Sequence, residues 1–135
     1  MSLTINKSVI HILKNTQEIS DIIGNKIYPL IAPKNTSFPY ITLKRVNILS
    51  EYTKEETGYD GVAVDVEIFT ELDKYVQGVE LAEIVRNTLL GVRNQEIKGN
   101  AINQIRLKDS DEDIVVDKDG NTASLQIVTV IIKVC

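Results

Sequence analysis

Apolar residues recur at helical spacing near the start of the chain. Ile5, Val9 and Leu13 lie on one side of a helix, and Thr4 before them is a suitable N-cap. A short second helix is expected after Thr16. Gly24 would end it, because glycine readily takes the left-handed conformation that follows many helices. Residues 27–33 are expected to be extended, since their prolines disfavour helix.

Two later segments alternate between apolar and polar positions, as strands with one buried face do. The clearer one places Val62, Val64, Val66 and Ile68 on one face and polar residues on the other. The other, residues 40–49, carries Ile41 and Leu43 on one face. Residues 50–61 between them are polar, and we predict a mobile loop or hairpin tip there.

A longer amphipathic helix is predicted between Asp73, its expected N-cap, and Gly91, its expected end. The predicted helix has a continuous apolar side. The residues expected to face the sheet are Val79, Ala82, Val85 and Leu89.

The last third of the chain is predicted to be strands. We expect strands at residues 101–107 and 114–116, an acidic turn at 109–113, and a tight hairpin turn at Asp119–Gly120. Residues 124–134 are apolar on both faces, which is typical of a strand in the middle of a covered sheet. The pattern predicts one α+β domain, residues 1–135, with a mainly antiparallel sheet of about four to five strands and two helices packed on one face.

Composition narrows the function classes. The chain has 15 Lys+Arg and 19 Asp+Glu, giving a net charge of −4. That balance excludes a general nucleic-acid binder, which needs a basic surface to displace phosphate counterions, but it permits contact with DNA that slides past. No window reaches the ~18 apolar residues of a membrane helix, and we expect no secretory signal, because no basic segment followed by an apolar run opens the sequence. The one cysteine, Cys135, cannot form an internal disulfide.

Candidate chemistry is sparse. His11 is the one histidine, and we interpret it as a partly buried or interfacial helix residue. Asp109, Asp111 and Asp113 have the spacing that opens an EF-hand calcium loop. However, Ile114 stands where the loop needs glycine, and Gly120 stands where it needs a bidentate glutamate. We therefore expect a solvated acidic turn, no metal, no cofactor and no catalysis. An enzyme or ligand-binding domain with an unrecognised site stays open as an alternative.

One motif carries a family resemblance. It consists of Gly24, then Ile27-Tyr28-Pro29, then Ala32-Pro33, then Phe38-Pro39-Tyr40. This series, with the alternating strand and the long helix after it, resembles the tail-completion proteins of long-tailed bacteriophages, also called tail terminators or tail-to-head joining proteins. The resemblance covers most of the chain. The motif also has a purely structural interpretation, in which its prolines fix extended backbone and its tyrosines pack at the edge of the core.

The resemblance implies a ring, typically a hexamer, that caps the head-proximal end of the tail tube. The implied partners are other copies of this chain, the tail-tube protein and a head–neck connector protein, with no membrane and no specific nucleic acid. The protein would be found in the host cytoplasm during assembly and then in the virion tail. A different neck or connector part, or a ring-forming adaptor outside phages, remains an alternative.

A ring of this kind would surround DNA during ejection. A basic lining would retain phosphates, whereas an acidic or neutral lining would let DNA slide. We therefore expect at least one of two acidic groups to face the lumen, although each could instead be ordinary outer surface. The first group is Asp65 and Glu67, and the second is Asp109, Asp111, Glu112 and Asp113.

Overall fold

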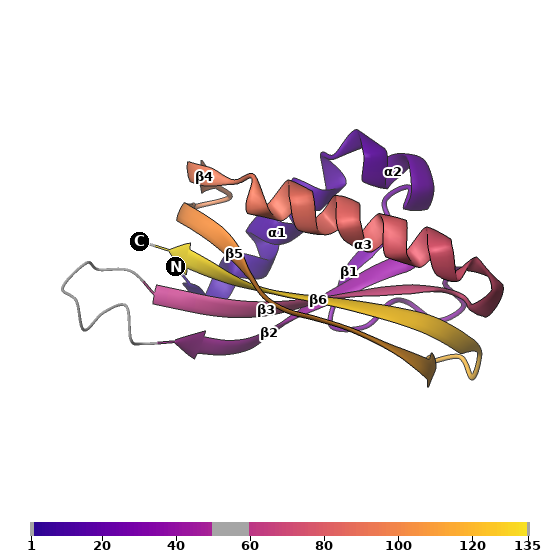
Figure 1. The fold of residues 1–135 in the computed structure, drawn as a ribbon. Helices are drawn as coiled ribbons and strands as arrows, with labels where there is room; N and C mark the ends of the chain where they lie inside the picture. The colour runs from indigo at the N-terminus through magenta and orange to yellow at the C-terminus, as the bar shows by residue number, and fades with distance from the viewer. Residues whose placement is uncertain (1, 50–59, 135) are drawn as a thin grey trace.

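The computed structural model describes residues 2–49 and 60–134 (Figure 1). Most of the predicted loop at 50–61 lies outside the described residues, as does Cys135, so neither expectation is tested.

Two short helices open the fold. A 3-10 turn at Ser2–Thr4 leads into α1 (Ile5–Lys14), and α2 (Gln17–Ile23) follows. Gly24 ends α2 with a φ of 66°, as its position in the sequence predicts. Thr4 occupies the N-cap position of α1 but makes no capping hydrogen bond with its side chain.

The sheet has more strands than the sequence predicts. The described residues form a 6-stranded sheet in the order β1-β2-β3-β6-β5-β4. Every neighbouring pair is antiparallel except β1 and β2, which run parallel. The strands are β1 (Ile27–Pro29), β2 (Tyr40–Leu49), β3 (Asp60–Glu71), β4 (Arg93–Ile97), β5 (Asn100–Val116) and β6 (Thr122–Val134).

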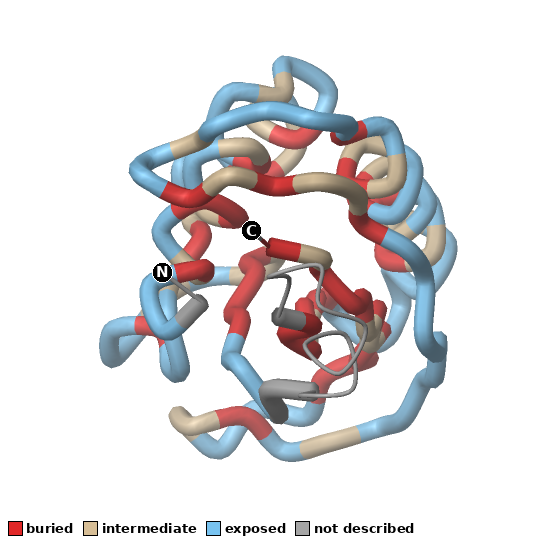
Figure 2. The backbone as a smooth tube through the Cα atoms, turned by 90° about the vertical axis from the view of Figure 1, so that its left-hand side faces the viewer, coloured by how far each residue is buried: buried red, intermediate tan, exposed pale blue. Residues whose placement is uncertain are grey.

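All the α-helices cover one face of this strongly twisted sheet, α1 and α2 beside α3 (Tyr75–Leu90) (Figure 1). The described part of the chain thus has three α-helices on that face where two were expected. The alternation in β3 is confirmed, because its inner residues are each 0% exposed. Figure 2 shows the buried positions gathered at the centre of the molecule. The inner residues of β3 and β6 are Val62, Val64, Val66, Ile68, Val128, Val130, Ile132 and Val134.

Helix α3 is rotated relative to the prediction. A 3-10 turn at Leu72–Lys74 precedes it, so Lys74 occupies the N-cap position that Asp73 was expected to take. At Gly78 a Cβ atom would lie 3.0 Å from the Thr70 Oγ1, a tighter contact than most Cβ atoms make, so glycine favours this close approach of the helix to β3. The buried line therefore begins at Gly78, and Val79 and Ala82 are only half-buried. It consists of Gly78, Leu81, Val85 and Leu89.

The expected acidic turn at 109–113 is wrong, because these residues lie inside the continuous strand β5. They pair with β6 along their whole length, after a bulge between Leu107 and Asp109. The long apolar strand β6 offers a backbone partner throughout, so the acidic side chains do not interrupt the ladder. Strand β4 was missed because its sequence, Arg-Asn-Gln-Glu-Ile, is mostly exposed and has no apolar alternation.

Replacing Val66 by Asp should unfold or aggregate the protein. Val66 is 0% exposed, so the substitution removes a buried side chain and places an unpaired charge in the core. The free energy of unfolding should fall by about 4 kcal/mol or more. Val76→Asp is the matched control, because Val76 is 65% exposed on α3. Circular dichroism melting of both variants checks this, and a soluble Val66→Asp protein with unchanged melting would contradict the register.

Candidate functional site

The face of the sheet opposite the helices collects acidic residues from two strands. Asp65 and Glu67 of β3 are half-buried on this face. Strand β6 pairs with β3 on one side and with β5 on the other, and directly paired residues share a face. The register therefore aligns acids of β3 with acids of β5. The rows across the sheet are Asp65–Thr129–Asp109, Glu67–Ile127–Asp111 and Phe69–Leu125–Asp113.

The two acidic groups singled out in the sequence are therefore mostly one surface. We call Asp65, Glu67, Asp109, Asp111 and Asp113 the acidic face. Positions of the same face also hold three basic residues, so the excess of negative charge is greatest along β5. These are Lys44, Arg106 and Lys133.

Glu112 is separate from the acidic face, because it points to the helix side of the sheet. Its Oε1 accepts hydrogen bonds from the Tyr75 hydroxyl at 2.7 Å and from the Gln126 amide at 3.0 Å. The Tyr75 hydrogen bond, with that of Gln126, lowers the pKa of Glu112. Glu112 thus links β5 to the start of α3.

Threonine hydroxyls hold the two acids of β3. Thr129 Oγ1 donates to Asp65 Oδ1 at 2.6 Å, and Thr42 Oγ1 donates to Glu67 Oε1 at 3.3 Å. These donors come from the strands on either side of β3, so they orient both carboxylates on the sheet surface.

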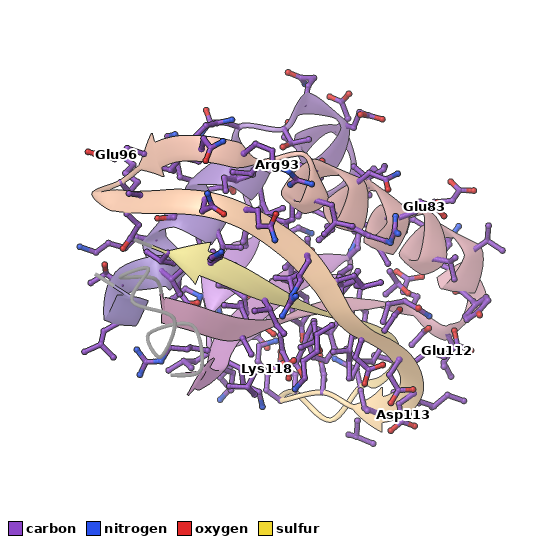
Figure 3. All side chains as sticks on the ribbon, turned by 60° about the vertical axis from the view of Figure 1, so that its left-hand side comes forward. Glu83, Arg93, Glu96, Glu112, Asp113 and Lys118 are labelled. Atoms are coloured by element: carbon purple, nitrogen blue, oxygen red, sulfur yellow. The ribbon has the colours of Figure 1, made fainter. Side chains whose placement is uncertain are left out.

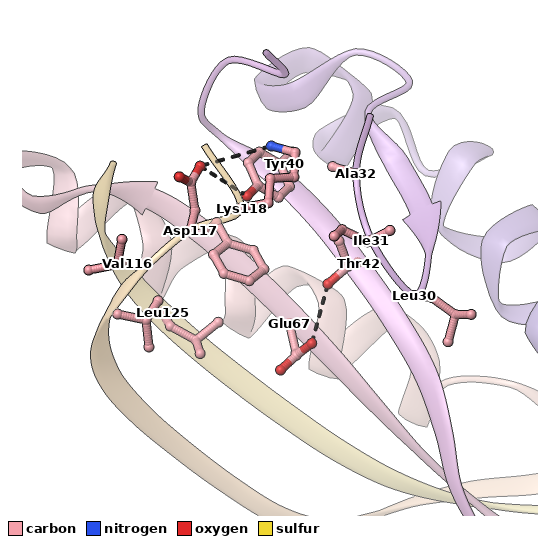
Figure 4. Close-up of a pocket in the computed structure, with 12 residues that line it drawn as sticks. Leu30, Ile31, Ala32, Tyr40, Thr42, Glu67, Val116, Asp117, Lys118 and Leu125 are labelled. Carbon is pink, nitrogen blue, oxygen red and sulfur yellow. Dashed lines mark hydrogen bonds and ion pairs between the residues drawn. The ribbon is translucent and has the colours of Figure 1, made fainter. Parts of the chain in front are cut away.

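An aromatic stack stands at one end of this face. The Tyr40 ring lies between Phe38, at 5.6 Å between centroids, and Phe69, at 4.9 Å. Lys118 Nζ lies 4.7 Å from the centre of the Tyr40 ring, and the Tyr40 hydroxyl donates to Asp117 Oδ2 at 3.4 Å (Figure 4). Burial, followed by the nearby Asp117 carboxylate, raises the pKa of Tyr40.

Two residues of the family motif, Phe38 and Tyr40, belong to this stack, whereas Ile27 belongs to the hydrophobic core. Ile27, Ala32 and Tyr40 are buried, Tyr28, Phe38 and Pro39 are half-buried, and Pro29 and Pro33 are exposed. The Phe38–Pro39 peptide bond is cis. For Tyr40, this placement agrees with the structural interpretation of the motif, in which its tyrosines pack at the edge of the core.

A groove of about 380 Å³ opens beside the stack (Figure 4). Glu67 and Thr42 line it from the sheet, and Leu30 and Ile31 lie at its rim with 71% and 65% of their surfaces exposed. Leu30 has a φ of 67°, in the left-handed region that a leucine rarely adopts. The groove joins the acidic face to exposed apolar side chains.

Sequence reasoning missed Asp117 and Lys118, which close one end of the groove. Asp117 Oδ1 accepts the N–H groups of Asp119 at 3.0 Å and Asn121 at 2.9 Å, so it shapes the hairpin turn. Asp119 Oδ2 in turn accepts the Asn35 N–H at 2.9 Å, and the hydrogen bond from Lys118 lowers the pKa of Asp119. The sequence did contain a signal for the role of Asp117, because an aspartate just before a predicted turn often accepts hydrogen bonds from the backbone of that turn.

Within residues 2–49 and 60–134, no group of three or more His, Cys, Asp or Glu side chains could hold a metal ion. No helix of the described chain is long and apolar enough to cross a membrane. His11 is exposed on α1, so of the two expectations for it, partial burial is wrong and an interfacial role stays a prediction.

Comparison with known proteins identifies the family. Residues 7–132 match the family described as Tail completion protein gp17. The chain belongs to this family. Comparison with curated protein sequences gives no significant match. Among solved structures, a chain from "Virion of native gene transfer agent (GTA) particle" has the same fold, with a TM-score of 0.67 and 11% identity over 95% of this chain and 92% of that chain.

Family membership confirms the resemblance predicted from the motif and the order of elements. As a member of the tail-completion family, the chain has a structural role in a bacteriophage tail. The comparison with the gene transfer agent chain adds the shared fold.

Removing the Tyr40 hydroxyl should make the free energy of unfolding fall less steeply as pH rises above ~10. A raised pKa means that the fold favours the neutral phenol, so this contribution is complete below the unfolded pKa of ~10 and is lost as pH rises through the folded pKa. In native protein, Tyr40→Phe should leave the phenolate absorbance gained just above pH ~10 unchanged. In concentrated urea, where Tyr40 of the wild type can ionise, the variant should gain less phenolate absorbance than the wild type, by the amount of one tyrosine. A smaller native signal in the variant would contradict the burial of Tyr40.

Proposed function

We propose that this protein forms a hexameric ring that closes the head-proximal end of a phage tail tube and joins the tail to the head. The observation that carries the proposal is the match to the tail-completion family over residues 7–132. A ring subunit needs two different complementary surfaces and no reactive centre. The protein therefore acts by contact rather than catalysis, in the host cytoplasm during assembly and then in the virion tail.

The exposed apolar side chains support docking to other proteins, because such side chains gathered together mark interaction sites. Leu30, Ile31 and Val116 line the groove, and Val116 is 67% exposed. On the helix side of the sheet, Tyr75 and Ile114 line a second hollow, and they are 46% and 67% exposed. We assign these surfaces to neighbouring copies, the tail-tube protein and the head–neck connector.

We further propose that the acidic face lines the lumen of the ring. Its support is the convergence of acids from β3 and β5 on one side of the sheet, away from the helices. Carboxylates repel the phosphates of a passing genome, so DNA would move through the ring without binding. Because the register places the acids of β3 and β5 on the same face, both groups would face the lumen together.

Reversing the charge of the β3 acids should slow DNA ejection without preventing assembly. We expect phage carrying Asp65→Lys with Glu67→Lys to eject more slowly, because the lining then attracts phosphates, and the delay should shrink as salt rises. Glu80→Lys with Glu83→Lys makes the same charge change on the exposed side of α3 and should eject normally. The ejection rate is measured as the release of DNA from the phage. If both variants release DNA at the same rate, the acidic face does not line the lumen.

Loss of the protein should leave tails that cannot mature. Electron microscopy of a lysate lacking it should show tubes of abnormal length that are not attached to heads, and light scattering of the purified protein with tail tubes should detect a ring on the tube. Tubes of normal length without heads would instead favour the alternative of a neck connector. Normal, attached tails would contradict both assignments.

A further inference from the structure

Strand β5 has a long edge that no other described strand covers. Strand β6 pairs with one side of β5 as far as Val116. On the other side, β4 pairs only with residues between Asn100 and Gln104. Figure 3 shows β5 continuing well beyond β4 toward Glu112 and Asp113. Residues 107–116 therefore form an edge that no other strand covers within the described part of the sheet.

A free edge of this length is a hazard for a protein that assembles in many copies. Its outward N–H and C=O groups form a template for pairing with a strand of another chain. At the opposite edge, β1 spans only Ile27–Pro29, and Pro29 has no N–H to donate.

Three aspartates occupy the outward donors of the β5 edge. The N–H of Ser110 donates to Asp109 Oδ1, that of Glu112 to Asp111 Oδ1, and that of Ile114 to Asp113 Oδ1, each at 2.8 Å. In an antiparallel ladder, alternate residues direct their backbone groups away from the partner strand. The carboxylates follow that alternation and bind successive donors along the edge.

We infer that Asp109, Asp111 and Asp113 close the β5 edge against strand addition by a second copy of this chain. Each carboxylate competes with an incoming carbonyl for the same N–H group. The same side chains would also meet like charges if two β5 edges paired antiparallel, and like charges across a strand pair are destabilising. Ring contacts are thereby left to other surfaces. This inference holds whether or not the acidic face lines a lumen.

The decisive comparison uses two triple variants. Changing all three aspartates to Ala removes both the carboxylate acceptors and the charge. Changing all three to Asn removes the charge but keeps an Oδ1 acceptor of the same reach. We expect the Ala variant to self-associate at a concentration at least tenfold lower than wild type, as measured by sedimentation over a concentration series. The Asn variant should need a higher concentration than the Ala variant, because it keeps the acceptors and loses only the charge repulsion.

Amide hydrogen exchange locates the new contact. In the associated Ala variant, the amides of Ser110, Glu112 and Ile114 should become protected as concentration rises. The inference is overturned if the Ala variant keeps the wild-type mass at every concentration, if it associates while these amides stay unprotected, or if the Asn variant associates as readily as the Ala variant.

A single substitution tests the hydrogen bonds even if the triple variants fail to fold. In Asp111→Ala, the Glu112 amide should exchange several-fold faster than in wild type, while the Ser110 and Ile114 amides should keep their rates because Asp109 and Asp113 remain. Asp111→Asn is the control and should leave the Glu112 amide unchanged. An unaltered Glu112 rate in Asp111→Ala would show that the carboxylate does not occupy the edge.

Discussion

The structure depends on β6, a strand that is apolar on both faces and paired on both sides. Val128, Val130 and Ile132 face the helices with at most 2% exposure, while Leu125 and Ile131 are buried on the other face. Because β6 lies between β3 and β5, it sets the register of both. The core beneath α3 and the convergence of acids on the opposite face are two consequences of the same strand.

Polar contacts at the two ends of the fold join elements that β6 does not reach. Asn100, which is 0% exposed, donates to Ser8 Oγ at 2.9 Å, and Ser8 Oγ donates to the Ile97 carbonyl at 2.7 Å. These bonds hold α1 against the β4–β5 turn. At the far end, the bond from Asn35 to Asp119 holds the loop before β2 against the β5–β6 turn. Both contacts join segments that are distant in the sequence.

Local patterns predicted the parts of the fold that local forces decide. The alternation at Val62–Ile68, the end of α2 at Gly24 and the central place of β6 were all readable from residue type and spacing. The rotation of α3 depends on the approach of Gly78 to Thr70, which no helical pattern contains. The continuity of β5 depends on β6 as a partner, whereas a run of aspartates by itself favours a turn. For the candidate site, the sequence indicated the acidic residues but not that those of β3 and β5 lie on one face of the sheet. It also did not indicate that Glu112 points to the other face, or that Asp117 lines the groove.

The order of synthesis gives the central strand a further consequence. Strands β3 and β5 are not neighbours in the sheet, and β6, which follows both in the chain, must enter between them. While the ribosome has yet to release β6, the β2–β3 and β4–β5 pairs have no common partner, and the inner valines of β3 lack the apolar strand beside them. Contacts between such distant segments form slowly because a large chain loop must close first. Productive folding of this protein therefore waits for translation of its final described strand, and a chain stalled before β6 would expose two unfinished sheet edges.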